Sequence, residues 1–351
     1  MRRRLVSLAA ATAALFLTAG PALACGGLIG PNGAVNLLRT TTFAGYHDGV
    51  EHYVTAFAFA GGEGEFGSLV PLPDIPTSIE RGGDWTLQRL ALETEPQLFL
   101  AQEAALGAAD RAEVLMEVRI DALDITILRG GGSEVGEWAT EHGFRLPPDA
   151  PEVLDFYANR SPIFLAAVFD ADAAAARGQA VGDGTPVHLT IPTDDPWVPL
   201  RILALGKSEA ETVEADVYLL TDERPALLPA PGSFLATDGM QLAHSDRASD
   251  QLLADLRSDQ GMAWVPDDAW LTKVRINAAA PDVSFDLAID AGGGLPSLVD
   301  AGFKTSGPAQ ALWVTSRALA PLVLIVALPL LMALFAASVT DHRMAPPPSG
   351  A

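Results

Sequence analysis

Alternating apolar and polar residues divide much of the chain into short β-strands. Segments 34–46 and 50–60 are rich in β-prone residues and are joined by Asp48-Gly49, the dipeptide that most strongly predicts a two-residue hairpin turn. Both alternating sets of the second segment are largely apolar. A strand with two apolar faces is buried on both sides, so we expect this hairpin to lie in the middle of a sheet.

The same alternation predicts further strands, most of them half-buried. We expect them over 65–73, 112–120, 124–128, 187–191, 200–205, 213–219, 270–276 and 283–289. The unbroken apolar run over 163–169 predicts a buried strand. Apolar residues at helical spacing predict four helices. These are expected between Asp84 and Pro96, from a Ser133 cap to a Gly143 stop, over 151–157 and over 249–257. Many strands and few short helices predict an α+β fold, mostly antiparallel β-sheet with helices packed on it.

The first 24 residues have the pattern of a secretory signal peptide. An arginine-rich start precedes an apolar run over 5–17, which is shorter than the ~20 residues that an uncleaved membrane anchor needs. The small residues Ala22 and Ala24 fit the subsites of a signal peptidase. We expect processing after Ala24, which makes Cys25 the first residue of the mature chain.

Cys25 is the only cysteine of the chain, so no internal disulfide can form. A cysteine directly after a cleavage site also suggests a lipoprotein. Lipoprotein signals carry an aliphatic residue, usually Leu, three positions before the cysteine, where this chain has Ala22. General secretion without acylation is therefore favoured over acylation, and over the twin-arginine route that Arg2-Arg3 matches loosely. A free thiol and an intermolecular disulfide both stay open.

The other end of the chain carries a second membrane signal. Residues 318–340 contain no charge and are rich in Leu, Ala and Val, and at ~1.5 Å per residue such a helix crosses a hydrocarbon core of ~30 Å. We therefore expect a single-pass protein with a transmembrane helix over 318–340 and a cytoplasmic tail over 341–351. A flexible stalk is expected over 291–317, because three consecutive glycines open it.

The predicted body, residues 25–290, is exported to the extracytoplasmic side of the cell membrane. It is either one domain or two subdomains that divide near the low-complexity segment 170–186. The chain has 44 Asp and Glu against 22 Lys and Arg, a net charge of -22. Such an acidic chain repels polyanions, which excludes nucleic-acid binding as a function class.

Candidate catalytic and metal-binding residues are few. His47 and His52 flank the predicted hairpin turn on one face, but zinc needs three or four ligands, so we interpret them as surface histidines. Residues 131–135 begin a G-x-S-x-G elbow without its last glycine, so Ser133 is better explained as a helix cap. The acidic pairs Asp170-x-Asp172 and Asp194-Asp195 do not continue into a calcium loop. The sequence thus predicts no catalytic, cofactor-binding or metal-binding residue and no cofactor.

Several segments occur in the order of a known bacterial family. They are "ALACGG" after the signal peptide, "HDGVEHYVTAFAFAG", "GSLVPLP", "DWTLQRLALETEP", "EVGEWATEHGFRLPPDAPEVLDFYANRSPIFLAAVF" and "LTIPTDDPWVPLRI". Over residues 24–205 the chain resembles domain of unknown function 2330. The resemblance implies an exported protein, with a terminal membrane helix in some members, and no activity. Many members have a second cysteine where this chain has Gly30, so the disulfide loop implied for those relatives cannot form here.

Two function classes remain as hypotheses. The first is a noncatalytic envelope module, tethered to the membrane, that binds an envelope protein or glycan or has a structural role. The missing catalytic motifs, the stalk and the anchor favour it. The alternative is an exported hydrolase whose catalytic groups come together only in the folded chain.

Overall fold

The structure is a computed structural model. It describes residues 27–30, 33–34, 40–58, 66–83, 85–94, 114–121, 123–170, 173, 184–231 and 239–302. All of these belong to one compact unit that ends at Gly302. The predicted processing residues Ala22, Ala24 and Cys25 lie outside the described residues, as do the predicted membrane helix over 318–340 and the tail. Most of the proposed subdomain break near 170–186 lies outside them as well.

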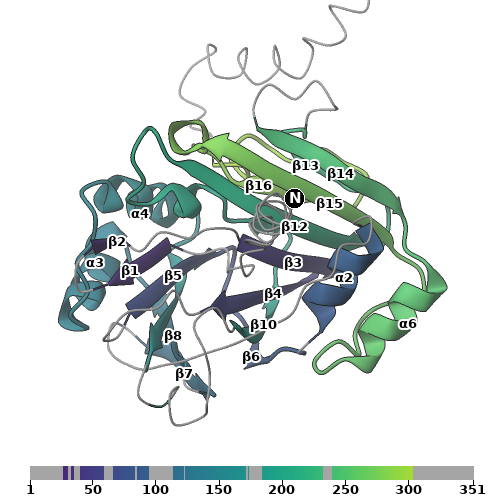
Figure 1. The fold of residues 1–351 in the computed structure, drawn as a ribbon, viewed down its shortest axis with the longest axis horizontal. Helices are drawn as coiled ribbons and strands as arrows, with labels where there is room; N and C mark the ends of the chain where they lie inside the picture. The colour runs from purple at the N-terminus through teal and green to yellow at the C-terminus, as the bar shows by residue number, and fades with distance from the viewer. Residues whose placement is uncertain are drawn as a thin grey trace, which may run out of the picture. The chain divides into compact units, whose positions relative to one another are not determined.

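The largest sheet, sheet A, has seven strands in the order β14-β15-β12-β3-β4-β10-β6 (Figure 1). Its strands are β3 (Thr40–His47), β4 (Val50–Ala58), β6 (Ser78–Arg81), β10 (Gly184–Pro192), β12 (Thr212–Thr221), β14 (Met240–Arg247) and β15 (Trp270–Ala279). Neighbours are antiparallel except β3 and β12, which are parallel. The mostly antiparallel α+β prediction is confirmed for the described residues.

The remaining strands form two antiparallel sheets. Sheet B has the order β2-β1-β5-β9-β8-β7 and a small sheet has the order β11-β16-β13. Sheet B consists of β1 (Gly27–Gly30), β2 (Gly33–Ala34), β5 (Phe66–Leu72), β7 (Val114–Ile120), β8 (Leu123–Arg129) and β9 (Ile163–Phe169). The small sheet consists of β11 (Trp197–Val198), β13 (Ala226–Leu228) and β16 (Leu287–Asp290).

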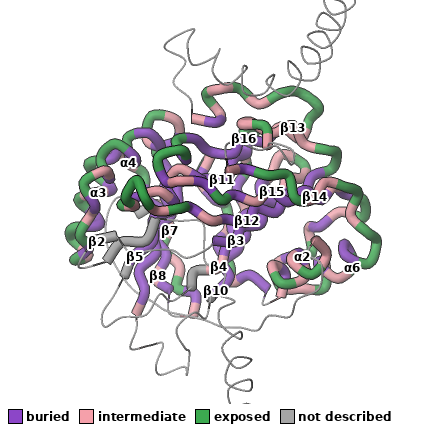
Figure 2. Tube along the Cα trace, turned by 45° about the horizontal axis from the view of Figure 1, so that its top comes forward, coloured by how far each residue is buried: buried purple, intermediate pink, exposed green. Residues whose placement is uncertain are grey.

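Short helices lie beside these sheets. They are α2 (Thr86–Thr94), α3 (Gly132–Glu141), α4 (Ala150–Ala158) and α6 (Asp250–Ser258), with 3-10 turns η2 (Arg201–Ala204) and η3 (Ala280–Asp282). Leu90 of α2 and Leu253 of α6 share a buried cluster with Phe43 and Tyr218 of sheet A. Buried residues follow the strands, whereas the helices carry exposed residues on their outer sides (Figure 2). In the described part of the chain no helix is long and apolar enough to cross a membrane.

The predicted central hairpin is confirmed. β3 and β4 pair from Thr42 opposite Thr55 to His47 opposite Val50. The turn residues Asp48 and Gly49 both have positive φ, 51° and 76°, as the tight hairpin turn with matching twist requires. β4 lies between β3 and β10, as a strand with two apolar faces predicts.

The helix caps differ from the predictions. Ser249, for which no cap was predicted, caps α6 by accepting a hydrogen bond from the amide of Leu252. The Ser133 cap is wrong, because α3 begins at Gly132 with Gly131 at the cap position, and the Ser133 hydroxyl donates to Glu134 instead. α2 is capped from a distance, since Asp259 accepts hydrogen bonds from the amide and hydroxyl of Thr86 at 2.9 and 2.7 Å. The cap predicted for that helix, Asp84, lies outside the described residues.

The strand predicted over 200–205 is wrong. This segment forms the 3-10 turn η2, because its first amides turn inward to a buried carboxylate, that of Asp286. Of the predicted stalk, residues 291–302 are described, and there Ala301 is buried and accepts a hydrogen bond from the amide of Asp286 at 3.0 Å.

Candidate functional site

Two histidines meet on the face of sheet A that also carries Phe43 and Tyr218. His52 of β4 and His188 of β10 are diagonal neighbours, and His52 Nδ1 lies 3.0 Å from His188 Nε2. The ring centroids are 5.2 Å apart with 26° between the planes. The distance between the centroids exceeds the distance between the two nitrogens by about the width of one ring. The rings therefore face each other through their edges and not through their faces. One N–H therefore donates to the lone pair of the other ring.

The indole of Trp264, from the loop after α6, covers His52. It stacks on His52 with centroids 3.9 Å apart and 2° between the planes. Gly45 of β3 lies under the same indole, where a Cβ would collide with the ring. The loop is thus held against β3 and β4, and the missing side chain of Gly45 leaves room for the Trp264 indole.

Burial keeps both histidines neutral. It lowers the pKa of His52 to about 3, with a smaller effect of the His188 ring, and it lowers the pKa of His188, which Glu80 offsets in part. A neutral pair with one shared hydrogen bond is a poor general base, because a catalytic base works best with a pKa near the working pH. Its clearest role is to join β4, β10 and the Trp264 loop.

The sequence prediction for the histidines was partly wrong. His47 binds Asp222 through Nδ1 at 2.6 Å and lies near the turn, as a surface histidine does. His52 instead pairs with a histidine 136 residues away. No local spacing signals that contact. Across the described ranges, no group of three or more His, Cys, Asp or Glu is arranged to hold a metal ion.

A buried carboxyl lies on the opposite face of β4. Glu51 is fully buried, and among the residues that the structure describes its two carboxyl oxygens have no hydrogen-bond partner. Burial raises the pKa of Glu51 to about 8. The backbone amide of Trp197 is near enough to lower this pKa in part, but it does not form a hydrogen bond of ordinary geometry with the carboxyl group. The group therefore carries a proton at neutral pH and stays uncharged beneath β11.

A second buried carboxylate joins three segments. Oδ1 of Asp286 accepts hydrogen bonds from the Tyr157 hydroxyl at 2.9 Å and from the amides of Leu200 and Arg201 at 2.7 and 3.0 Å. Oδ2 pairs with Arg160, whose guanidinium lies 3.8 Å from the ring centroid of Trp197. The partners of this carboxylate are residues in or just after α4 and the two amides at the start of η2. It therefore fixes α4 and η2 to the start of β16.

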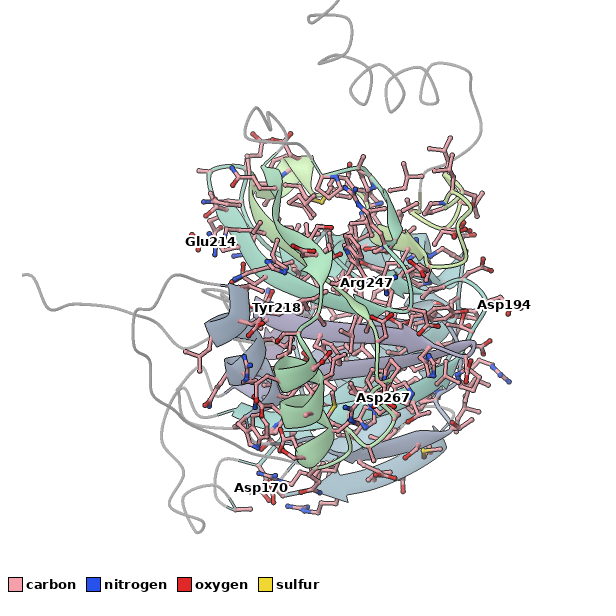
Figure 3. All side chains as sticks on the ribbon, turned by 90° about the vertical axis from the view of Figure 1, so that its right-hand side faces the viewer. Asp170, Asp194, Glu214, Tyr218, Arg247 and Asp267 are labelled. Carbon is pink, nitrogen blue, oxygen red and sulfur yellow. The ribbon has the colours of Figure 1, made fainter. Side chains whose placement is uncertain are left out.

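Sheet A also buries a lysine. Lys273 is fully buried, with Nζ 3.6 Å from an Asp216 carboxylate oxygen and 5.0 Å from the ring centroid of Tyr218. Tyr218 is buried, whereas Asp194 lies at the right-hand margin of the domain and Asp170 at its lower end (Figure 3). This ion pair neutralises a charge within the sheet, as buried charges require.

An open groove of ≈ 580 Å³ runs between α3 and α4. Its polar lining comes from Ser133, Glu137, Thr140 and Glu141 of α3 and from Asp155 of α4, and Leu146, Pro151 and Leu154 supply apolar surface. The two helices approach closely at Gly132, where a Cβ would collide with Asp155. The groove is concave and open, and three carboxylates stand among a lining that is mostly apolar.

The acidic pairs noted in the sequence have separate local roles. Asp170 accepts a hydrogen bond from the Ala173 amide and pairs with Arg119 at 3.1 Å, and Asp172 lies outside the described residues. Asp194 and Asp195 are exposed in a turn, and the pKa of Asp195 is raised by partial burial and by Asp300.

Comparison with solved structures returns baculovirus P35. Two structures of mutated P35 after caspase cleavage match with 8% and 7% identity and TM-scores of 0.38 and 0.36. They cover 73% and 72% of this chain and 98% and 99% of the other chain. A caspase-8/P35 complex matches with 9% identity and a TM-score of 0.34, over 72% of this chain and 90% of the other. Likeness at this level assigns no function.

The comparison of sequences is more specific. No curated protein matches this chain. A family model described as "Uncharacterized protein conserved in bacteria (DUF2330)" matches residues 19–289, which include every described strand and helix up to the last strand, β16. The predicted resemblance is therefore confirmed, and the chain belongs to this bacterial family.

Proposed function

We propose that this chain is a noncatalytic binding module of the bacterial envelope. A membrane helix over 318–340 anchors it, and residues 25–290 project on the extracytoplasmic side. The length and composition of that apolar segment support the anchor, and the leader with Ala22 and Ala24 supports export.

The pairing of His52 with His188 carries the noncatalytic part of the proposal. General bases and nucleophile activators need a free lone pair near the working pH. Here the lone pair of one ring accepts a hydrogen bond from the other ring, and burial lowers the pKa of both rings. The buried carboxylate of Asp286 is likewise engaged by four groups of the fold.

The anchor and its orientation are tested in bacterial cells that express the full chain with an epitope after residue 351. Protease added to intact spheroplasts should digest the body and leave a small membrane-bound fragment that keeps the epitope. Carbonate at high pH should leave the undigested chain in the membrane pellet. A body protected from external protease, or a chain released by carbonate, contradicts the proposal.

The binding role is tested on the same cells with a membrane-impermeant crosslinker. We expect a discrete adduct that excess detergent-solubilised full chain displaces. The purified full chain should also fail to turn over chromogenic esters, phosphates, glycosides and peptides. Turnover that a single polar substitution abolishes would favour the exported hydrolase instead.

A further inference from the structure

A short segment crosses the end of the β3–β4 hairpin between β10 and β11. It consists of residues 193–196, and we call it the strap. We propose that the strap opens when the carboxyl group of Glu51 ionises, so that this end of sheet A responds to rising pH. The inference goes beyond the proposed binding function and does not depend on it.

The strap lies on the face of sheet A to which Glu51 points. Tyr46 of β3 and Glu51 of β4 are opposite each other in register, and paired residues of neighbouring strands share a face. The Tyr46 hydroxyl donates to the carbonyl oxygen of Thr193, the first residue of the strap, at 3.0 Å. The residue after the strap is Trp197, whose amide lies near the Glu51 carboxyl group. The strap therefore runs over Glu51 between these two contacts.

The closed strap leaves Glu51 in an unfavourable place for a charge. Its side chain is fully buried, and among the described residues its two oxygens have no hydrogen-bond partner. Burial raises its pKa to about 8. An ionised carboxylate without a cation or a donor bears the full cost of leaving water. Ionisation therefore favours a conformation in which water reaches Glu51.

The groups around the strap are themselves acidic. Asp194 and Asp195 of the strap are exposed, and Asp194 lies at the margin of the domain (Figure 3). The pKa of Tyr46 is raised by its burial and by four carboxyl groups around it, those of Asp194, Asp195, Glu51 and Asp290. The pKa of Asp195 is raised by partial burial and by Asp300. A further negative charge at Glu51 adds repulsion between the strap and the hairpin.

The other described neighbours of Glu51 do not supply a balancing charge. Ile191 of β10 is opposite Glu51 in register and is apolar. Tyr53, the next residue of β4 on this face, has an uncharged phenol. The guanidinium of Arg160 lies over the ring of Trp197, 3.8 Å from its centroid, and is already in an ion pair. Opening the strap to water is thus the available way to accommodate the charge.

Backbone hydrogen bonds hold the strap at its two ends. The amide of Thr193 donates to the carbonyl oxygen of Gly49 at 3.1 Å, and the amide of Ile289 donates to that of Pro196 at 3.0 Å. The chain is fixed on both sides of the strap, by the pairing of β10 with β4 before it and by the bonds of η2 to Asp286 after it. A short segment between two fixed points can open locally while the rest of the body stays folded.

The test is hydrogen exchange of the detergent-solubilised full chain at pH 6, 7 and 8, resolved to single amides. Each measured rate is divided by the intrinsic rate at that pH. The amides of Thr193 and Ile289 report the strap, because each donates at one of its ends. The amide of Val217, in the interior strand β12, reports global unfolding. Glu51→Gln removes the charge, and Glu117→Gln, at an exposed position of β7, is the matched control.

In the wild type we expect the corrected rates at Thr193 and Ile289 to rise by up to about tenfold per pH unit, because opening releases one proton. Both rates should exceed that of Val217 by at least about tenfold at every pH, since local opening costs less than global unfolding. In Glu51→Gln the two rates should not change with pH. In Glu117→Gln they should follow the wild type.

Tyr46→Phe provides an independent readout. It removes the hydroxyl that binds Thr193, so exchange at Thr193 should rise roughly twofold to tenfold at every pH, the effect of one net hydrogen bond. The dependence on pH should stay as in the wild type, because Glu51 is retained.

Three results overturn the inference. They are strap amides that exchange no faster than Val217, corrected wild-type rates that do not change with pH, and a pH dependence that survives Glu51→Gln. Thermal unfolding at pH 6 checks that each variant is folded. If Glu51→Gln does not fold, the wild-type rates and Tyr46→Phe decide, and an unchanged rate at Thr193 in Tyr46→Phe counts against the strap.

Discussion

The Trp264 indole and the His52 imidazole lie face to face, 3.9 Å apart and within 2° of parallel. His52 is hydrogen-bonded in turn to His188, so one stack and one hydrogen bond join the loop after α6 to β4 and β10. The stack has no room for a larger residue beneath it, since a Cβ on Gly45 would meet the indole. Packing at this point therefore depends on a glycine in a strand, where glycine is otherwise unfavourable.

Gly45→Ala should therefore destabilise the protein by about 1–3 kcal/mol, the usual cost of overpacking a filled core. Urea unfolding measures the loss, and near-UV circular dichroism should report a displaced Trp264. Gly136→Ala is the control: a Cβ there makes ordinary contact with Leu146 at 3.4 Å, and alanine suits a helix better than glycine by about 0.5–1 kcal/mol. If the two variants lose equal stability, the indole does not restrict residue 45.

The buried Glu51 carboxyl predicts a loss of stability as the pH rises from about 4.5 to about 8. Its folded pKa of about 8 is above the value of 4.5 for an accessible glutamate, so between these values the folded state keeps a proton that the unfolded state has released. The stabilising contribution is complete below pH 4.5 and is lost at about 1.4 kcal/mol per pH unit as the pH rises toward 8. Glu51→Gln should remove this slope, because the amide is neutral at every pH.

Urea unfolding at intervals between pH 5 and 9 measures the difference between the wild type and Glu51→Gln. The groups nearest in register are Tyr46 of β3 and Ile191 of β10, and the pKa of Tyr46 is raised by its burial and by Asp194 and Asp195. Tyrosine thus titrates above the window in both proteins. Parallel stability curves for the two proteins would mean that Glu51 is ionised in the folded state.

The histidine pair predicts the opposite behaviour in acid. Both pKa values are lowered, that of His52 to about 3. Below pH 6.5 the two histidines therefore bind protons in the unfolded chain and stay neutral in the folded protein. Stability should fall as the pH drops from about 6.5 toward 3. In the double variant His52→Phe, His188→Leu, which removes donor and acceptor together, this part of the acid slope should disappear.

Thermal unfolding between pH 3.5 and 7 checks this prediction as the difference between the double variant and the wild type, since the remaining carboxylates titrate in both. His244→Phe, in the edge strand β14, serves as the control and should retain the wild-type slope. A double variant that loses stability in acid as steeply as the wild type would rule out the neutral pair.

Local signals explain which parts of the fold the sequence predicts. The turn at Asp48-Gly49 depends on adjacent residues, and its prediction is confirmed. The helix over 249–257 follows from apolar residues at helical spacing, and the structure forms it as α6. The unbroken apolar run over 163–169 also predicts β9, a strand that is buried along its whole length. Family resemblance added the order of these elements and no chemistry.

Long-range contacts explain the failures. His52 and His188 are 136 residues apart, and Asp259 caps α2 across 173 residues. Periodicity within a short window contains no information about either pair. The groove was missed for a related reason: α3 and α4 were predicted, but their close approach at Gly132 arises only when the two helices pack. The apolar residues of 200–205 predict a strand. They form a turn instead because the amides of Leu200 and Arg201 bind the carboxylate of Asp286, and a contact with so distant a residue cannot be inferred from local sequence.

That carboxylate, Asp286, supports the last prediction. Asp286→Ala would leave Arg160 and the amides of Leu200 and Arg201 without their acceptor in a buried place, and breaking a buried ion pair costs about 3–5 kcal/mol. Asp286→Asn should cost less, since its amide oxygen can still accept the bonds of Oδ1 while the charge opposite Arg160 is lost. Asp282→Ala, at an exposed site nearby, should change stability by less than about 0.5 kcal/mol. Urea unfolding of the three variants ranks them. If Asp286→Ala is as stable as Asp282→Ala, then α4 and η2 are held to β16 by apolar packing alone, and the four bonds of this carboxylate contribute nothing net to the fold.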